Sequence, residues 1–170
     1  MQKRKNKILA IDPGTRYIGV AVFNGKELSY YDVKTIQQRK SPHELLTEGR
    51  KIIRMLLEDF RPETLVVEKT MFANIKGSAT LNKFTDEIIK IGRKRRLRTH
   101  TLSANTVRKR ICGNGWASKQ DVAREIVARF PELKPYASSD RRWKEEFFYN
   151  MFDAVAVGVA VAKRKGSAFQ

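Results

Sequence analysis

The sequence has very little cysteine and no long apolar segment. Cys112 is the only cysteine, so no disulfide can form within the chain, which is typical of a reducing compartment. The longest apolar run covers residues 154–162, whereas a membrane-spanning helix needs about 18 residues. Asp12 interrupts the apolar run that follows the basic start of the chain, which argues against a signal peptide. We therefore expect a soluble, cytoplasmic protein with no membrane partner.

Acidic residues are also scarce. Asp and Glu number 18 against 35 Lys and Arg, which gives a formal net charge of +17. Such an excess indicates a polyanionic partner. We expect nucleic acid rather than a lipid surface, because no stretch combines a basic face with bulky apolar anchors. Basic runs at residues 93–98, 108–110 and 163–165 would track phosphates, and such binding weakens steeply as salt rises.

The hydrophobic share of 41% and the length of 170 residues suit a single domain with its own core, residues 1–170. Apolar or alternating runs predict strands at residues 7–11, 19–23, 26–34, 64–67 and 99–102. Asn24-Gly25 predicts a type I′ hairpin between the second and third strands.

Helical spacing and N-capping residues predict helices at residues 42–61, 81–95, 104–111, 119–130 and 143–163. Residues 131–142 read as irregular. Hairpin strands followed by alternating helices and strands predict an α/β fold. Its mixed sheet would have three antiparallel strands and then parallel strands, with helices on both faces.

Three acidic residues stand where a site could form. Asp12 ends the first strand, just before a Pro-Gly turn, and Glu68 ends the fourth. If these strands are parallel neighbours, both carboxylates lie at the carboxyl edge of the sheet, where open α/β sheets bind ligands. Asp153 lies in the small and apolar stretch NMFDAVAVGVAVA, where a buried charge needs a partner such as a cation.

Converging carboxylates raise one another's pKa, and divalent ions remove this repulsion. Oxygen ligands favour Mg²⁺ or Mn²⁺ over zinc. Two such ions about 4 Å apart can activate a water and stabilise the leaving oxygen of a phosphodiester. Taken singly, Asp12 could simply form a turn and Glu68 could be a solvated strand end. Together with the basic excess, the three acids predict a two-metal site for phosphodiester hydrolysis.

Four stretches carry motifs: ILAIDPGTRYIGVAV, LVVEKTMF, TVRKRICGNGWASKQDVAREIV and NMFDAVAVGVA. In sequence, order and spacing they resemble the RuvC family of Holliday-junction resolvases, over nearly the whole chain. The resemblance implies an RNase H-like fold. It also implies a homodimeric, metal-dependent endonuclease that resolves four-way DNA junctions by paired nicks, with two Mg²⁺ ions per site and Mn²⁺ as a substitute. A branch-migration helicase is a further partner that the resemblance raises.

The resemblance implies that the metal ligands are Asp12, Glu68 and Asp153. The chain departs from the family at Asn150, where an acid is usual. An amide oxygen can still bind a metal but brings no charge, so the second ion would bind more weakly. Glu146 lies seven residues before Asp153 on the same helical face and is the alternative fourth ligand.

The resemblance also implies contacts with DNA. Lys119 and Lys109 would contact phosphate near the scissile bond, with Arg108 in place of Lys109 if the register shifts by one. Phe72 would wedge into the junction, or it could be a loop aromatic or a dimer contact. The segment before the last helix carries a basic pair that could bind DNA or belong to a surface loop, Arg141 and Arg142. The predicted helix at residues 81–90, with the loop before it, is the candidate dimer interface.

Other readings remain open at this point. A YqgF-type nuclease of ribosomal RNA maturation would share the fold and the DPGTRYIGVAV motif. A junction-binding protein without catalysis is conceivable because Asn150 replaces an acid. An ATPase of the kinase and actin superfold also begins with a similar motif, but it needs a second such domain, for which this chain is too short.

Overall fold

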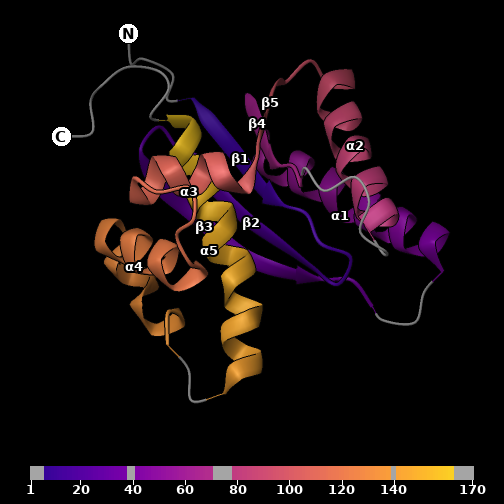
Figure 1. Cartoon of the computed structure of the whole chain (residues 1–170). Helices are drawn as coiled ribbons and strands as arrows, with labels where there is room; N and C mark the ends of the chain where they lie inside the picture. The colour runs from indigo at the N-terminus through magenta and orange to yellow at the C-terminus, as the bar shows by residue number, and fades with distance from the viewer. Residues whose placement is uncertain (1–5, 38–40, 71–77, 139–140, 163–170) are drawn as a thin grey trace, which may run out of the picture.

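The computed structural model describes residues 6–37, 41–70, 78–138 and 141–162 (Figure 1). Its strands are β1 (Lys7–Asp12), β2 (Tyr17–Asn24), β3 (Glu27–Thr35), β4 (Thr64–Glu68) and β5 (Arg98–Leu102). Its α-helices are α1 (Pro42–Phe60), α2 (Ser78–Lys94), α3 (Ala104–Cys112), α4 (Lys119–Arg129) and α5 (Arg142–Ala162). Within the described ranges, no helix is both long and apolar enough to pass through a membrane.

The strands form one sheet in the order β3-β2-β1-β4-β5. The β1 and β2 strands are antiparallel, as are β2 and β3, whereas β4 and β5 run parallel to β1. The mixed α/β sheet predicted from the sequence is thus confirmed. Ile11 pairs with Val67 in the parallel register, so Asp12 and Glu68 leave the sheet side by side at the same edge.

Helices cover both faces of the sheet (Figure 1). Successive side chains of β1 point to opposite faces, so Leu9 and Ile11 pack with α1 and α2, whereas Ile8 and Ala10 pack with α3, α4 and α5. A strand buried on both faces needs an almost continuous apolar sequence, which is why KILAID lacks polar alternation before its final acid.

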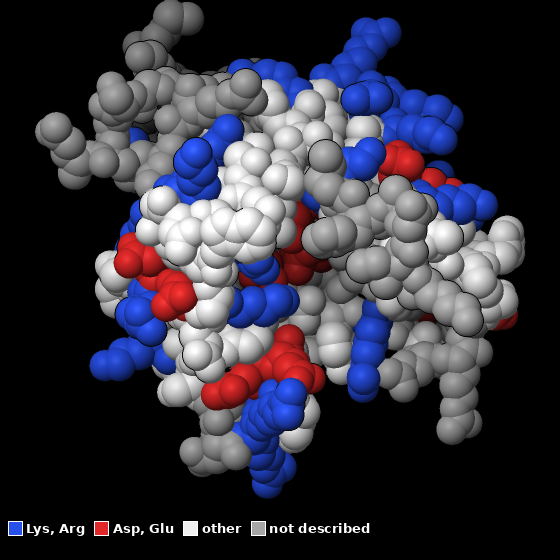
Figure 2. Space-filling model, viewed as in Figure 1, with Lys and Arg blue, Asp and Glu red and all other residues white. Residues whose placement is uncertain are grey.

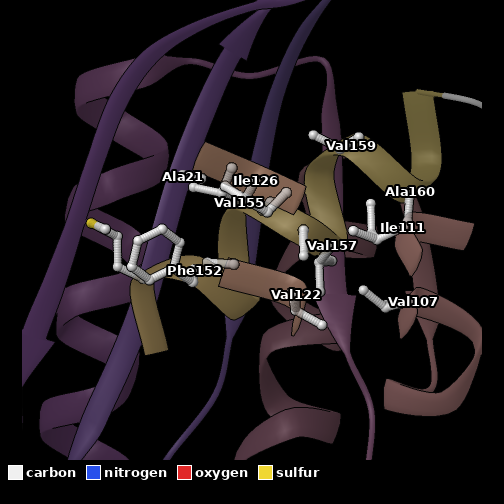
Figure 3. Close-up of a cluster of buried hydrophobic side chains, with 14 of the residues drawn as sticks. Ala21, Val107, Ile111, Val122, Ile126, Phe152, Val155, Val157, Val159 and Ala160 are labelled. Carbon is white, nitrogen blue, oxygen red and sulfur yellow. The ribbon is translucent and has the colours of Figure 1, made fainter. Parts of the chain in front are cut away.

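The α5 helix is the centre of the hydrophobic core that it forms with α3, α4 and one face of the sheet (Figure 3). It presents small or branched side chains to the sheet and to α3 and α4. The larger Phe152 ring is also almost fully buried in this core. The helix lies unusually close to the strands. A Cβ on Gly19 would stand 1.8 Å from the backbone oxygen of Asn150, and a Cβ on Gly158 would stand 2.2 Å from the Phe23 ring. These two glycines therefore permit the close approach of α5.

Two local predictions differ from the structure. The β2–β3 loop consists of Gly25, with φ 64°, and Lys26, which has no positive φ. A type I′ turn needs positive φ at both loop residues, so the predicted type I′ turn is wrong. Asn24 pairs with Glu27 in the ladder, which makes Gly25 the first loop residue, as in a type II′ turn. The segment expected to be irregular contains a 3₁₀ helix, η1 (Pro131–Tyr136), anchored by the buried Leu133.

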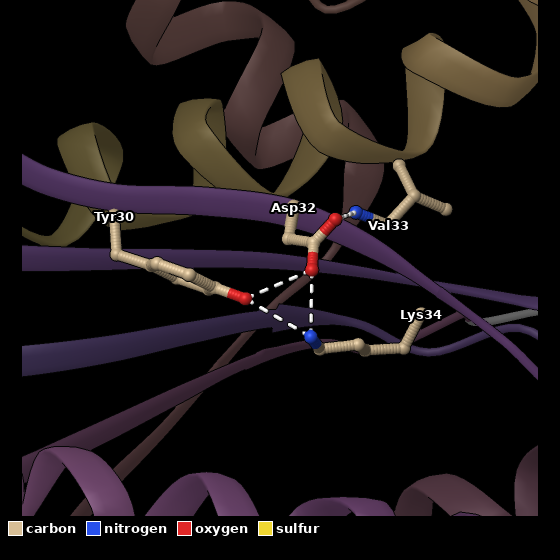
Figure 4. A network of polar contacts seen from close by, with 4 residues as sticks. All are labelled: Tyr30, Asp32, Val33 and Lys34. Atoms are coloured by element: carbon tan, nitrogen blue, oxygen red, sulfur yellow. Dashed lines mark hydrogen bonds and ion pairs between the residues drawn. The ribbon is translucent and has the colours of Figure 1, made fainter.

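The edge strand β3 carries a polar network on the α1 face (Figure 4). Asp32 accepts hydrogen bonds from the Tyr30 hydroxyl at 2.8 Å and the Lys34 ammonium at 2.6 Å. The Lys34 ammonium also donates to the Tyr30 hydroxyl at 3.0 Å. Charged side chains on an edge strand disfavour pairing with a further strand, so this network protects the open edge of the sheet.

Candidate active site

The site begins at the carboxyl edge of the sheet, where the parallel strands β1 and β4 end. Asp12 and Glu68 are the last residues of these strands and both line the same cavity. The turn after Asp12 is tight, because a Cβ on Gly14 would stand 2.2 Å from the Tyr17 carbonyl oxygen. Closure of this turn accounts for Gly14.

Asp153 reaches the same cavity from α5, although it is 85 residues beyond Glu68 in the chain. The close contact of α5 with β2 at Gly19 places the helix turn containing Asn150 and Asp153 beside the strand ends. The three acids that the sequence singled out therefore come together in one place, and each comes from a different element of the fold.

The cavity has a volume of about 230 Å³. Its lining combines the acids with two basic side chains and several neutral residues: Asp12, Pro13, Glu68, Thr70, Leu81, Ala104, Val107, Arg108, Lys119, Val122, Asn150 and Asp153. Figure 2 shows acidic side chains at the bottom of a hollow near the middle of this face, with basic side chains next to them. The hollow is thus acidic inside a basic surface.

Lys119 is the cation in direct contact with the acids. Its Nζ lies 3.0 Å from Oδ2 of Asp153. Lys119 is the first residue of α4, held there by a capping box between Ser118 and Asp121. A cation is disfavoured at a helix N-terminus, so the ion pair with Asp153 offsets an unfavourable position. Burial disfavours the ammonium, but Asp153, Asp12 and Glu68 together outweigh it and raise the pKa of Lys119.

The three carboxylates hold protons more tightly than free acids do. Burial raises the pKa of Asp12 well above its usual value, and the charges of Glu68 and Asp153 raise it further. Burial and the charge of Asp153 raise the pKa of Glu68 to about 7, against partial relief from Lys119 and Arg108. Burial also raises the pKa of Asp153, and Lys119 offsets part of this effect. The site is short of positive charge.

The donor set fits a hard divalent cation, because it consists of carboxylate and amide oxygens. In the geometry of the described residues, no three Asp, Glu, His or Cys side chains are already gathered closely enough to hold an ion. The Lys119 ammonium supplies the positive charge beside Asp153 instead. Metal binding would therefore require the acids to lose their protons and Lys119 to give up part of its contact with Asp153.

The structure separates the two alternatives for a fourth ligand. Asn150 lines the cavity, and its Nδ2 donates to the carbonyls of Glu146 and Phe147, each at 3.1 Å. Its Oδ1 is thereby left on the side away from these carbonyls. Glu146 is an exposed residue that pairs with Arg142 at 3.3 Å and does not line the cavity. The geometry thus favours Asn150.

The basic residues also differ in their placement. Arg108 lines the cavity and lowers the pKa of Glu68 and Asp153, whereas Lys109 is exposed and lies outside the lining. Of these two residues, Arg108 is therefore the one that lies on the cavity. Two exposed residues at the start of α5 also lie outside the lining, Arg141 just before the helix and Arg142 as its first residue. Phe72 lies outside the described residues.

Sequence reasoning missed Thr70, whose side chain lines the cavity two residues after Glu68. Its hydroxyl can donate to a phosphate oxygen or accept from a bound water. The signal was present in the EKT part of the second motif, where a hydroxyl follows the acid at a spacing that returns it to the same face of an extended chain.

The fold and the site together define a class of protein. An RNase H-like α/β sheet, with partly buried acids at its carboxyl edge inside a basic surface, is the arrangement of a nuclease domain. The family model for crossover junction endodeoxyribonuclease RuvC matches residues 8–141. The chain belongs to this family.

Relatives and solved structures agree with this assignment. The crossover junction endodeoxyribonuclease RuvC of Pelodictyon phaeoclathratiforme is 24% identical over 166 residues, which cover 94% of this chain and 81% of the relative. The Thermus thermophilus RuvC structure superposes with a TM-score of 0.70 at 20% identity, covering 94% of this chain and 95% of that one. T. thermophilus RuvC in complex with Holliday junction substrate gives 0.69 at 19% identity, with 91% of both chains covered. The fold is therefore shared along almost the whole chain.

Proposed function

We propose that this protein is a metal-dependent endonuclease that resolves four-way DNA junctions by hydrolysing phosphodiester bonds in opposite strands. The observation that carries the proposal is the convergence of Asp12, Glu68 and Asp153 in one cavity of a basic protein. Its relatives are crossover junction endodeoxyribonucleases, and nucleases of this family depend on metal ions. The T. thermophilus relative has been solved with a Holliday junction, which supports branched DNA as the substrate here.

The proposed cofactor is a pair of Mg²⁺ ions, for which Mn²⁺ substitutes. Asp12, Glu68 and Asp153 would hold them, with Oδ1 of Asn150 as a neutral further ligand. When bound, such ions supply a nucleophilic water at neutral pH and stabilise the leaving oxygen. Because Asn150 brings no charge, one of the two ions should bind more weakly than it would beside a fourth carboxylate.

The chain's own residues would orient the phosphate. Arg108 and Lys119 both lie on the cavity, so they can each donate to oxygens of the scissile phosphate. Their charges also offset part of the effect of burial on the acids, since both lower the pKa of Glu68 and Asp153. Thr70, two residues after Glu68, can position a phosphate oxygen or a water. Lys109, exposed on α3, would hold a phosphate farther along the strand.

The proposed assembly is a homodimer of a single RNase H-like nuclease domain, residues 1–170. A four-way junction has approximate two-fold symmetry, so two related sites can cut opposite strands. We place the interface on α2 and the loop before it. The proposed location is the cytoplasm, because a chain with one cysteine forms no internal disulfide and so does not depend on an oxidising compartment. A branch-migration helicase is a further proposed partner.

The test is cleavage of a synthetic four-way DNA junction by wild-type protein and by Asp12→Asn. We expect the variant to lose Mg²⁺-dependent nicking and to keep its junction affinity at moderate salt, because the amide removes a charge from the site and leaves the basic surface intact. Asp59→Asn, on the exposed side of α1, is the matched control and should nick like wild type.

If wild-type protein binds the junction but nicks it with neither Mg²⁺ nor Mn²⁺, the protein is a binding protein and the proposal is wrong. A structured ribosomal RNA precursor is the second substrate in the same assay. Faster cleavage of that RNA than of four-way DNA would favour the YqgF-type activity instead.

A further inference from the structure

The loop between α3 and α4 exposes a tryptophan. The Trp116 side chain is 86% exposed, more than the other large exposed hydrophobic residues among those described, Met55 at 44% and Trp143 at 60%. Exposing an indole to water forgoes the burial of a large apolar surface. A residue of this kind on the rim of a site is a candidate for contact with a partner.

The backbone of this loop is held by hydrogen bonds in which the indole takes no part. Gly113 ends α3 in the left-handed region, with φ 77°, and its amide donates to Lys109. The Asn114 side chain accepts a hydrogen bond of 3.0 Å from the Trp116 amide. Ala117 is buried directly after it. The backbone is thus hydrogen-bonded on both sides of Trp116, and the side chain projects from it into solvent.

The backbone of Trp116 lies close to that of Lys119, a residue of the proposed site. Trp116 stands three residues before Lys119, whose Nζ contacts Asp153 at 3.0 Å. Three residues of chain span at most about 11 Å, so the Trp116 backbone lies within about 11 Å of that of Lys119. At about 3.4 Å per nucleotide along one strand, this distance corresponds to up to about three nucleotides from a phosphate that occupies the cavity.

The charge around Trp116 indicates the chemistry of its partner. Residues 103–120 contain no Asp or Glu and four basic residues, namely Arg108, Lys109, Arg110 and Lys119. Arg110 donates to the Ala160 carbonyl at 3.0 Å, while Arg108 and Lys119 line the cavity. A nucleic-acid strand suits this combination, because its phosphates match the cations and its bases can stack on an indole.

We propose that Trp116 stacks on a base of the DNA strand beside the scissile phosphate and so positions that strand for cleavage. The inference rests on the proposed function and adds a positioning residue to it. Stacking is available to every base, but it needs a face that is unstacked from its neighbour. Branch points and flexible steps offer such a face, so Trp116 would favour cleavage at positions where the strand is readily unstacked.

The binding test compares Trp116→Ala, Trp116→Phe and the matched control Trp143→Ala, each combined with Asp12→Asn so that the DNA stays intact. We expect Trp116→Ala to raise the Kd for a four-way junction between about 5- and 100-fold. Trp116→Phe should recover most of the affinity. The slope of log Kd against log salt should not change, because no phosphate contact is removed. Trp143→Ala should match the parent.

The chain has two tryptophans, so Trp143→Phe leaves Trp116 as the sole indole. Adding junction DNA to this variant should quench its fluorescence, as base stacking on an indole does. An unchanged Kd for Trp116→Ala, or no quenching at saturating DNA, would overturn the inference. So would a shift of the monomer–dimer equilibrium by Trp116→Ala with unchanged DNA affinity, because the indole would then belong to a protein interface.

The same experiment separates the inference from the proposed function. If the parent binds and wild-type protein nicks the junction while Trp116→Ala behaves like its parent, the inference alone fails. If neither protein binds four-way DNA, both fail together.

Discussion

Replacing Glu68 by Gln should stabilise the metal-free protein at pH 8. Burial and the nearby charge of Asp153 raise the pKa of Glu68 from 4.5 to about 7. Between these two pH values the folded protein binds more protons at Glu68 than the unfolded chain does. The free energy of unfolding therefore falls as pH rises through this window, and the loss is complete above pH 7. A neutral Gln cannot contribute to that loss.

The size of the effect follows from the interval between the two pKa values. An interval of about 2.5 pH units at 1.36 kcal/mol each gives an upper limit of about 3 kcal/mol. For a chain of this length, 1 kcal/mol corresponds to about 2–4 °C in Tm. The Tm of Glu68→Gln in EDTA should thus exceed that of wild type by up to about 12 °C at pH 8. At pH 4.5 the two proteins should melt together.

Thermal unfolding in EDTA at a series of pH values is the assay. Glu125→Gln, an exposed carboxylate on α4, is the matched control and should follow the wild-type curve. Adding Mg²⁺ should reverse the order at pH 8, because a metal that binds only the folded state stabilises wild type by mass action and stabilises the variant less. A lower Tm for Glu68→Gln than for wild type at pH 8 in EDTA would refute the reasoning.

Three further perturbations test the site and the core. Lys119→Gln removes a cation that lowers the pKa of Glu68 and Asp153. The rise in nicking rate with pH should therefore move to higher pH, which a pH–rate profile at saturating Mg²⁺ measures. Gly19→Ala would place a Cβ 1.8 Å from the Asn150 carbonyl oxygen, so it should displace α5. We expect it to lower the free energy of unfolding by about 3 kcal/mol in urea and to lower the nicking rate. Wild-type behaviour in both assays would contradict the proposed packing. Phe152→Ala should lower the free energy of unfolding by about 3–5 kcal/mol in the same assay, because the Phe152 ring is almost fully buried. A loss of less than about 1 kcal/mol would show that the core collapses around the gap.

Local signals in the sequence determined most of the framework. Capping boxes at Ser41 with Glu44 and at Ser118 with Asp121 fix where α1 and α4 begin, and both can be read from residues three positions apart. The hairpin pattern and the apolar strands also predicted the mixed sheet, which is confirmed. These features depend on residues only a few positions apart, so a reader of the sequence has all the information that decides them.

The tertiary structure decided what converges on the site. The approach of α5 to β2 at Gly19 brings Asp153 to the ends of β1 and β4. The orientation of α3 places Arg108 rather than Lys109 on the cavity, and the packing of α5 leaves Glu146 outside it. Helical spacing gives the relative direction of side chains along one helix, but only the contacts between elements fix how that helix is rotated against the sheet. The sequence by itself therefore identified the three acids, and the packing of α5 on the sheet brought them into one cavity.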